Sequence, residues 1–181
     1  FHASLMEENN PEWKTVVINE ATGNLYVPNG SIGFRWEKNG KWNLSEGISP
    51  RLSLLGIEDE IAEVAFPYFG VDRAKVLYGN VPIKKLCANG KEMFVATIYD
   101  LLLANYGVGA SYEEDAPYTP AWAEKHCDVK KELIIKVARE FAQNADQTRG
   151  KSMVILGAAI NHWYHGDMAY RGIINMLMMC G

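Results

Sequence analysis

Several side chains that could do chemistry lie close together in one short stretch, GAAINHWYHGD, at residues 157–167. Two of the four histidines, His162 and His165, lie three positions apart here, and Asn161 directly precedes the first of them. Imidazole and amide groups both donate and accept hydrogen bonds, and Gly157 would let a ligand come close to the backbone. The residues of this stretch therefore predict a binding site that suits an anionic group.

Two other interpretations of the same residues stay open. A histidine in a loop is often a hydrogen-bonded packing residue, and Asp167 would then be no more than a helix cap. Alternatively, His162, His165 and Asp167 would supply three ligands to zinc. This zinc signal is weak, because a histidine pair on a loop lacks a matching fourth ligand.

The elements on either side of this loop decide where it lies. Residues 152–159, SMVILGAA, are almost continuously apolar, which is typical of a strand covered on both faces. A helix is expected from about 167 to 179. Ligands of open α/β sheets bind where strands end and helices begin, so the loop has the position of a binding site.

Two further helices are expected upstream. Thr119 is a candidate N-cap with Pro120 at the first helical position, and Asp128 is expected to cap a longer helix over 129–146. The order helix, strand, loop, helix predicts an α/β layer fold with a parallel sheet.

The first part of the chain has a β pattern. Residues 13–19 and 25–28 predict one hairpin, and residues 32–36 and 41–44 predict a second one around an Asn-Gly turn. The whole fold class expected is therefore α/β, with a β-hairpin-rich N-terminal part followed by α/β layers.

The middle of the chain is harder to interpret. Loops are expected to dominate residues 51–90, apart from a short amphipathic helix over 57–64. A helix is expected over 93–104 with Gly107 just after its end. The acidic stretch 111–120 is expected to be a surface loop whose charges are solvated.

We divide the chain into three segments that form one unit cut from a longer chain. Residues 1–50 are hairpin-rich, residues 51–118 are mixed α/β, and residues 119–181 are the helix-strand-helix segment that carries the site.

Composition excludes several classes of protein. The 181 residues are 48% hydrophobic and 22% charged, which is typical of a globular protein. The net charge of −4 gives no reason to expect binding to nucleic acid. No apolar run reaches the roughly 20 residues that a membrane span needs. Cys87, Cys127 and Cys180 match no disulfide scaffold or thiolate metal motif and indicate reduced thiols in the cytosol.

Several motifs in order along the chain resemble a known family: PNGSIGFRW, GKWNL, VAFPYFG, YTPAWAE, IIKVAREFAQNAD and, above all, NHWYHGDMAYRGIINML at 161–177. They resemble the catalytic alpha subunits of membrane-bound respiratory nitrate reductases, within the molybdopterin oxidoreductase family. The resemblance extends over nearly the full chain and is weakest over 45–60 and 71–92.

This resemblance implies reduction of nitrate to nitrite in the complete subunit. The cofactors implied are molybdenum bis(molybdopterin guanine dinucleotide) and a 4Fe-4S cluster. The partners implied are an iron-sulfur beta subunit and a haem-containing gamma subunit, which receives electrons from quinol, at the cytoplasmic face of the cell membrane.

The resemblance also implies roles for individual residues. The position of His162 is commonly a glutamine near molybdenum in the wider family, so His162 is the candidate catalytic residue. Gly157, Asn161, His162 and His165 are candidates for contacts with the cofactor. Asp167 is not the family's molybdenum-ligating aspartate, since that residue and the cluster ligands belong to regions upstream of this window.

The chain alone is therefore expected to bind no cofactor and to have no activity. Two alternative functions stay open: another molybdopterin oxidoreductase, of the formate or sulfoxide type, and a stand-alone α/β module that binds an anion.

Overall fold

The computed structural model describes residues 16–26, 49–67, 76–88 and 91–180, and it divides the chain into two units, 1–109 and 110–181. The predicted hairpin at 32–36 and 41–44 lies outside the described residues. Among the described residues, no helix has the length and apolar character needed to cross a membrane.

The first predicted hairpin is confirmed in the first unit. Strands β1 (Val17–Ile18) and β2 (Leu25–Tyr26) pair antiparallel, and Ile18 is buried. Gly23 lies in the connecting turn with φ of 72°, a left-handed conformation that glycine adopts without strain.

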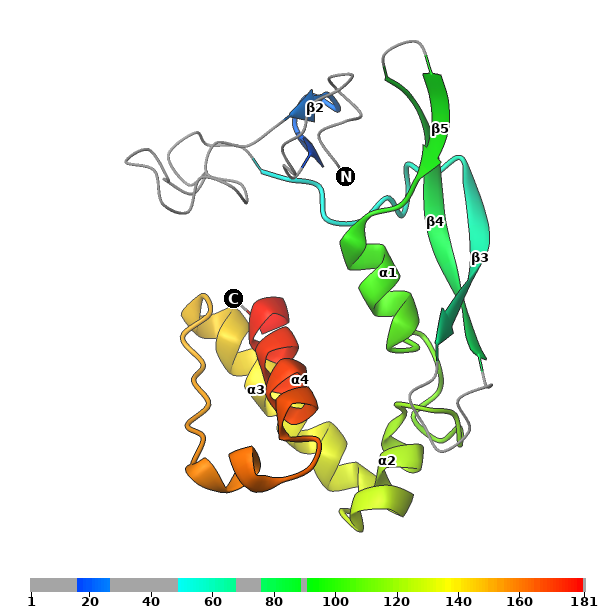
Figure 1. Ribbon diagram of the computed structural model, residues 1–181. Helices are drawn as coiled ribbons and strands as arrows, with labels where there is room; N and C mark the ends of the chain where they lie inside the picture. Colours follow the sequence, from blue (N-terminus) through cyan, green and yellow to red (C-terminus); the bar gives the residue numbers. More distant parts are fainter. Residues whose placement is uncertain (1–15, 27–48, 68–75, 89–90, 181) are drawn as a thin grey trace. The chain divides into compact units, whose positions relative to one another are not determined.

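A second antiparallel sheet of the first unit contains β3 (Glu60–Pro67), β4 (Val76–Ala88) and β5 (Lys91–Val95), with β4 in the middle. The first part of the long strand β4 pairs with β3, and its second part pairs with β5 (Figure 1). The helix predicted over 57–64 is therefore wrong, as is the expectation that loops dominate 51–90. From Glu63 onward β3 alternates exposed and half-buried residues, which is the period of a strand.

Helix α1 (Ile98–Asn105) packs against β4 in the first unit. The contact is close: a Cβ atom added to Gly79 would lie 3.0 Å from the Cβ of Ala104. The helix begins later than predicted because residues 91–95 form β5. Its end is as expected, with Gly107 at φ of 65° just beyond it.

A buried carboxylate joins α1 to the segment before β3. Asp100 is 4% exposed, and its Oδ2 accepts hydrogen bonds from the backbone N–H of Leu54 at 2.8 Å and from Thr97 Oγ1 at 2.7 Å. Thr97 Oγ1 in turn accepts from the N–H of Asp100 at 2.9 Å, which caps the helix. Leu54 is fully buried, so its N–H has no access to water.

We predict that Asp100→Ala lowers the free energy of unfolding of the chain by roughly 2–3 kcal/mol, because it leaves a buried N–H without an acceptor. Urea titration followed by circular dichroism measures the change. The control is Glu140→Ala, since Glu140 forms an exposed pair with Lys136, and loss of this pair should cost less than about 0.5 kcal/mol. Equal effects of the two substitutions would contradict the role of Asp100.

The second unit is helical. It contains α2 (Pro120–Cys127), α3 (Lys131–Thr148), the short 3₁₀ turn η3 (Ala158–His162) and α4 (Gly166–Cys180). Helices α3 and α4 lie side by side and contact each other (Figure 1). The predicted cap is confirmed, because Thr119 Oγ1 accepts from the N–H of Trp122 at 3.2 Å.

The predicted role of Asp128 is wrong. Asp128 ends α2 in a left-handed conformation, with φ of 57°, and α3 begins three residues later without a side-chain cap from its own N-cap residue. Glu124 of α2 takes this role, since its carboxylate accepts from the N–H of Lys131 at 3.1 Å and from Lys130 Nζ at 2.8 Å. One carboxylate thus fixes the junction between two helices.

The acidic loop before α2 lies at the surface as predicted, and its charges also form exposed ion pairs. Glu113 pairs with Lys131, and Asp115 pairs with Lys125. The hydroxyl of Thr119 also donates to the backbone oxygen of Glu114 or Ala116, at 2.6 and 2.8 Å. The loop is therefore attached to both helices by charged and polar contacts at the surface.

The junction of α2 and α3 shifts the pKa values of two of its charged side chains, Glu124 and Lys130. The hydrogen bond from Lys130 lowers the pKa of Glu124, with a smaller contribution from the Lys131 N–H. The same contact raises the pKa of Lys130. Because the pKa of Glu124 is lower in the folded than in the unfolded chain, this junction adds stability above the unfolded-state pKa and loses it as pH falls through the folded-state pKa.

We predict that Lys130→Met raises the pKa of Glu124 towards its ordinary value, because it removes the largest cause of the shift. A carboxyl-carbon NMR titration measures this pKa directly. Lys136→Met is the matched control, since Lys136 pairs with Glu140 and should leave Glu124 unchanged. An unaltered Glu124 titration in Lys130→Met would show that the pair does not form in solution.

The predicted parallel sheet is not found among the described residues, where all paired strands are antiparallel. Residues 152–157, expected to be a strand, are extended between α3 and η3 and pair with no other strand of the described part (Figure 1). Met153 is 76% exposed and Ile155 is 84% exposed. The described chain therefore has mixed helices and strands, and no layer covers this segment on both faces.

Candidate functional site

The candidate site is the loop that joins the extended segment 152–157 to α4. Gly157 precedes the single 3₁₀ turn η3, and Trp163 ends that turn, with its N–H donating to the oxygen of Ile160 at 3.2 Å. The chain then turns into α4 at Gly166, whose N–H donates to the oxygen of Trp163 at 3.0 Å. Two successive tight turns thus present residues 157–165 at the amino end of a 15-residue helix.

All four predicted site residues, Gly157, Asn161, His162 and His165, are exposed. Within the described residues, the three polar side chains make no hydrogen bond or ion pair with one another. The ring of His165 lies edge-on to that of Tyr164, with centroids 4.6 Å apart, and Tyr164 itself is 94% exposed. The loop therefore brings the residues together in sequence but does not join them in a polar network.

The amino end of α4 offers fewer free amides than expected. The N–H groups of Met168 and Ala169 both donate to the oxygen of His165, at 3.1 and 3.2 Å. Asp167 adds a carboxylate to the first turn. Because the loop itself uses these donors, attraction of an anion would rest mainly on the side chains of Asn161, His162 and His165.

Sequence reasoning missed the importance of Gly166, the buried residue of α4. A Cβ atom placed on Gly166 would lie 2.2 Å from the backbone oxygen of Ile160, so the fold of this loop requires a glycine. The signal in the sequence that could have identified Gly166 was its position between His165 and the first turn of a predicted helix. Gly157, by contrast, would have nothing within 4 Å of an added Cβ, which leaves open space beside the loop.

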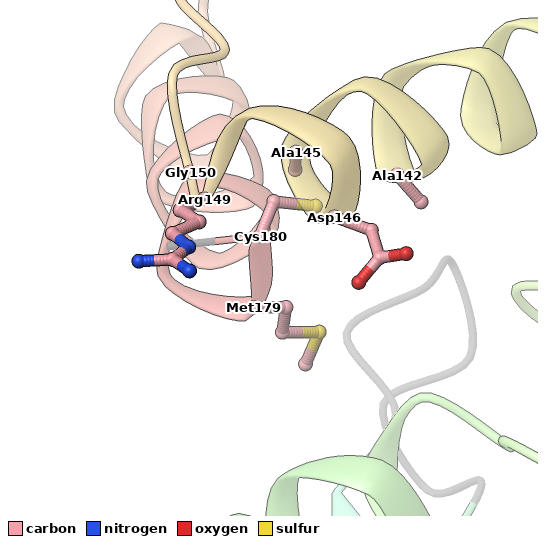
Figure 2. A pocket seen from close by; sticks show the side chains of 7 residues that line it. All are labelled: Ala142, Ala145, Asp146, Arg149, Gly150, Met179 and Cys180. Carbon is pink, nitrogen blue, oxygen red and sulfur yellow. The ribbon is translucent and has the colours of Figure 1, made fainter.

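A metal site and a cavity are the two other arrangements to consider in the described chain. Among the described residues, no group of three His, Cys, Asp or Glu side chains could hold a metal ion, so His162, His165 and Asp167 do not form a zinc site there. A cavity of about 500 Å³ lies between the last turns of α3 and α4, with Asp146, Arg149 and Met179 in its wall (Figure 2). None of the four predicted site residues lines this cavity.

Comparison with known proteins identifies relatives of the chain. The chain is 51% identical over 98% of its length to the respiratory nitrate reductase 1 alpha chain of Escherichia coli strain K12. It is 47% identical over 94% of its length to the nitrate reductase alpha chain of Bacillus subtilis strain 168. The chain matches a segment of nitrate reductase alpha chains.

A more distant relative gives the same result. The nitrate reductase alpha subunit of Mycobacterium tuberculosis strain H37Rv is 35% identical over 97% of the chain. The chain spans only 15–16% of the length of these relatives. No protein-family model matches it. The resemblance inferred from the motifs is thereby confirmed, whereas the roles of Gly157, Asn161, His162 and His165 stay predictions.

Proposed function

We propose that this chain is part of the catalytic subunit of a respiratory nitrate reductase, which reduces nitrate to nitrite. The observation that carries this proposal is the 51% identity over 98% of the chain to a respiratory nitrate reductase alpha chain. Since the chain spans 16% of that relative, the activity belongs to the complete subunit. The 181-residue chain alone is inactive under this proposal, and nitrate reduction by the purified chain would contradict it.

The cofactor of the complete subunit would be molybdenum bis(molybdopterin guanine dinucleotide), with a 4Fe-4S cluster. When bound, the molybdenum centre supplies the two electrons and the oxygen-accepting metal for nitrate reduction. The residues of the loop fit one wall of such a site: their side chains are exposed, those of Asn161, His162 and His165 form no hydrogen bond or ion pair with one another among the described residues, and the space beside Gly157 is open.

Within this wall, His162 is the residue we assign to the chemistry. Its exposed imidazole can donate a hydrogen bond to a bound oxyanion, or accept one, without breaking any contact in the described chain. Asn161 and His165 would hold the cofactor from the same loop, and Gly157 would allow the cofactor to approach the backbone. Trp163 is 67% exposed and can help to exclude water once the site is closed.

The partners and location follow from the same proposal. The relatives are named alpha chains, which implies further subunits. We propose an iron-sulfur beta subunit and a haem-containing gamma subunit that transfers electrons from quinol. The catalytic subunit would then lie at the cytoplasmic face of the membrane and be held there through its partners.

We also propose that residues 152–157 are a strand of a parallel sheet completed by the rest of the subunit. Three observations support this. The segment is extended and apolar, its backbone N–H groups have no backbone partner among the described residues, and Met153 and Ile155 on one side are exposed. In such a sheet the loop at 157–165 would lie at the carboxyl end of a strand, where ligands of α/β proteins bind.

Hydrogen exchange tests this strand. We predict that the amides of residues 153–156 exchange at least about a hundredfold more slowly in the complete subunit than in the 181-residue chain, since only the former offers them acceptors. The amides of residues 141–144, inside α3, are the internal control and should be protected in both proteins. Equally fast exchange at 153–156 in both would refute the strand.

Substitution of His162 in the complete subunit tests the site. We predict that His162→Ala lowers nitrate reduction by about 10–100-fold, because the residue contacts the metal's surroundings or the bound oxyanion. Nitrite production gives the activity, and elemental analysis with pterin fluorescence gives the cofactor content. Loss of activity with molybdenum retained places His162 at the chemistry, and loss of both makes it a cofactor-holding residue.

The matched control is His126→Ala. His126 belongs to α2, where its ring lies 4.3 Å from that of Trp122, and it is outside the loop. This substitution should leave both activity and molybdenum content unchanged. If His162→Ala behaves like His126→Ala, His162 is a packing residue and the assignment is wrong.

A further inference from the structure

Helix α4 has two apolar faces, and only one of them is covered in the described chain. Ile173 and Leu177 are half-buried on the side that faces the rest of the second unit, where α4 contacts α3 and η3. Met168, Met176 and Met179 are 48%, 37% and 44% exposed. With Gly172 they recur every third or fourth position, so they share one side of the helix, which we call the methionine face.

Gly172 lies at the centre of the methionine face. An added Cβ would meet nothing within 4 Å there, so no neighbour in the described chain requires a glycine. A glycine inside a helix lowers its stability relative to alanine, and its physical advantage is that it lets another backbone come close. The methionines around it are flexible side chains that adapt to the shape of a partner.

The surroundings of the face indicate what kind of partner it fits. Asp167 and Arg171 form a separate polar row on α4, one turn apart, and Met178 lies with this row at 74% exposed. The methionine face itself carries no charge. At its carboxyl end, Met179 points into the cavity of about 500 Å³ between α3 and α4 (Figure 2). An apolar face that ends in an open cavity suits permanent packing better than a transient, wet contact.

We propose that the methionine face packs against an apolar segment from the remainder of the same subunit, and that this segment crosses α4 at Gly172. This inference rests on the proposed function, because the relatives are about seven times as long as this chain and so provide the segment. A second copy of the chain, or a different subunit, would make the face an interface between chains and would overturn the proposal.

Methionine oxidation tests the proposal in the complete alpha subunit, purified without other subunits. Dilute hydrogen peroxide converts accessible methionine to the sulfoxide, and peptide mass spectrometry gives a rate for each residue. We expect Met168, Met176 and Met179 to oxidise at least tenfold more slowly than Met178 of the polar row. Oxidation of all four at similar rates would overturn the proposal.

The same measurement on the 181-residue chain identifies the occupant. Here Met168, Met176 and Met179 should oxidise about as fast as Met178, at every protein concentration. Protection that appears only as the concentration of the complete subunit rises would assign the face to a second copy. Protection that appears only after the other subunits are added would assign it to one of them.

Substitution at Gly172 provides a second, independent test. Gly172→Leu should lower the melting temperature of the complete subunit by several degrees, because the added side chain occupies the place of the crossing segment, and Gly172→Ala should lower it less. Arg171→Leu introduces the same side chain in the polar row and should have no such effect. An unchanged melting temperature in Gly172→Leu would overturn the proposal.

Neither readout depends on catalysis. Nitrate reduction by the wild-type complete subunit is measured separately, so loss of the proposed function and loss of this inference are distinguishable. Protection of the methionine face in a subunit that does not reduce nitrate would leave the inference standing and refute the proposed function alone.

Discussion

The candidate site depends on one constraint, which is that the backbone N–H groups of residues 152–157 need hydrogen-bond acceptors. An extended apolar segment needs neighbouring strands to accept its N–H groups and cover its side chains. The described chain provides neither on the side of Met153 and Ile155. Because η3 follows directly from this segment, the sheet that we propose for residues 152–157 would also set where the candidate residues lie.

The opposite side of the same segment is attached to α3. The hydroxyl of Ser152 accepts from the amide of Asn144 at 2.9 Å, and the N–H of Lys151 donates to Thr148 Oγ1 at 3.1 Å. The turn at Arg149 and Gly150, both with positive φ, brings the chain back along the helix. The second unit thus orients the segment and leaves one of its sides available for a sheet.

Local signals in the sequence were sufficient for elements that are determined by their own residues. Thr119 and Pro120 predicted the start of α2, Gly107 predicted the end of α1, and the apolar spacing over 129–146 predicted α3. Each of these signals acts within a few residues, through a cap or one helical face. They remain correct whatever the rest of the protein does.

Elements that depend on distant partners were predicted less well. Residues 57–64 were expected to be helical, but from Glu60 onward pairing with β4 selects the strand. Aspartate is a common N-cap residue, so Asp128 was a reasonable prediction for α3. Glu124, which lies within α2, accepts from the first N–H of α3 instead. A carboxylate that acts from another element leaves no pattern in the sequence near its target.

The site combines both kinds of information. The residue types at 157–165 and their place before a helix were predicted from the sequence, and the structure adds that a glycine at 166 is needed for the loop to turn. The N–H groups of Gly166, Met168 and Ala169 donate to carbonyls of the loop, so the helix end contributes less to anion binding than its position suggests. Under the proposed function, recognition of an anion would depend on the exposed imidazole and amide groups of the loop.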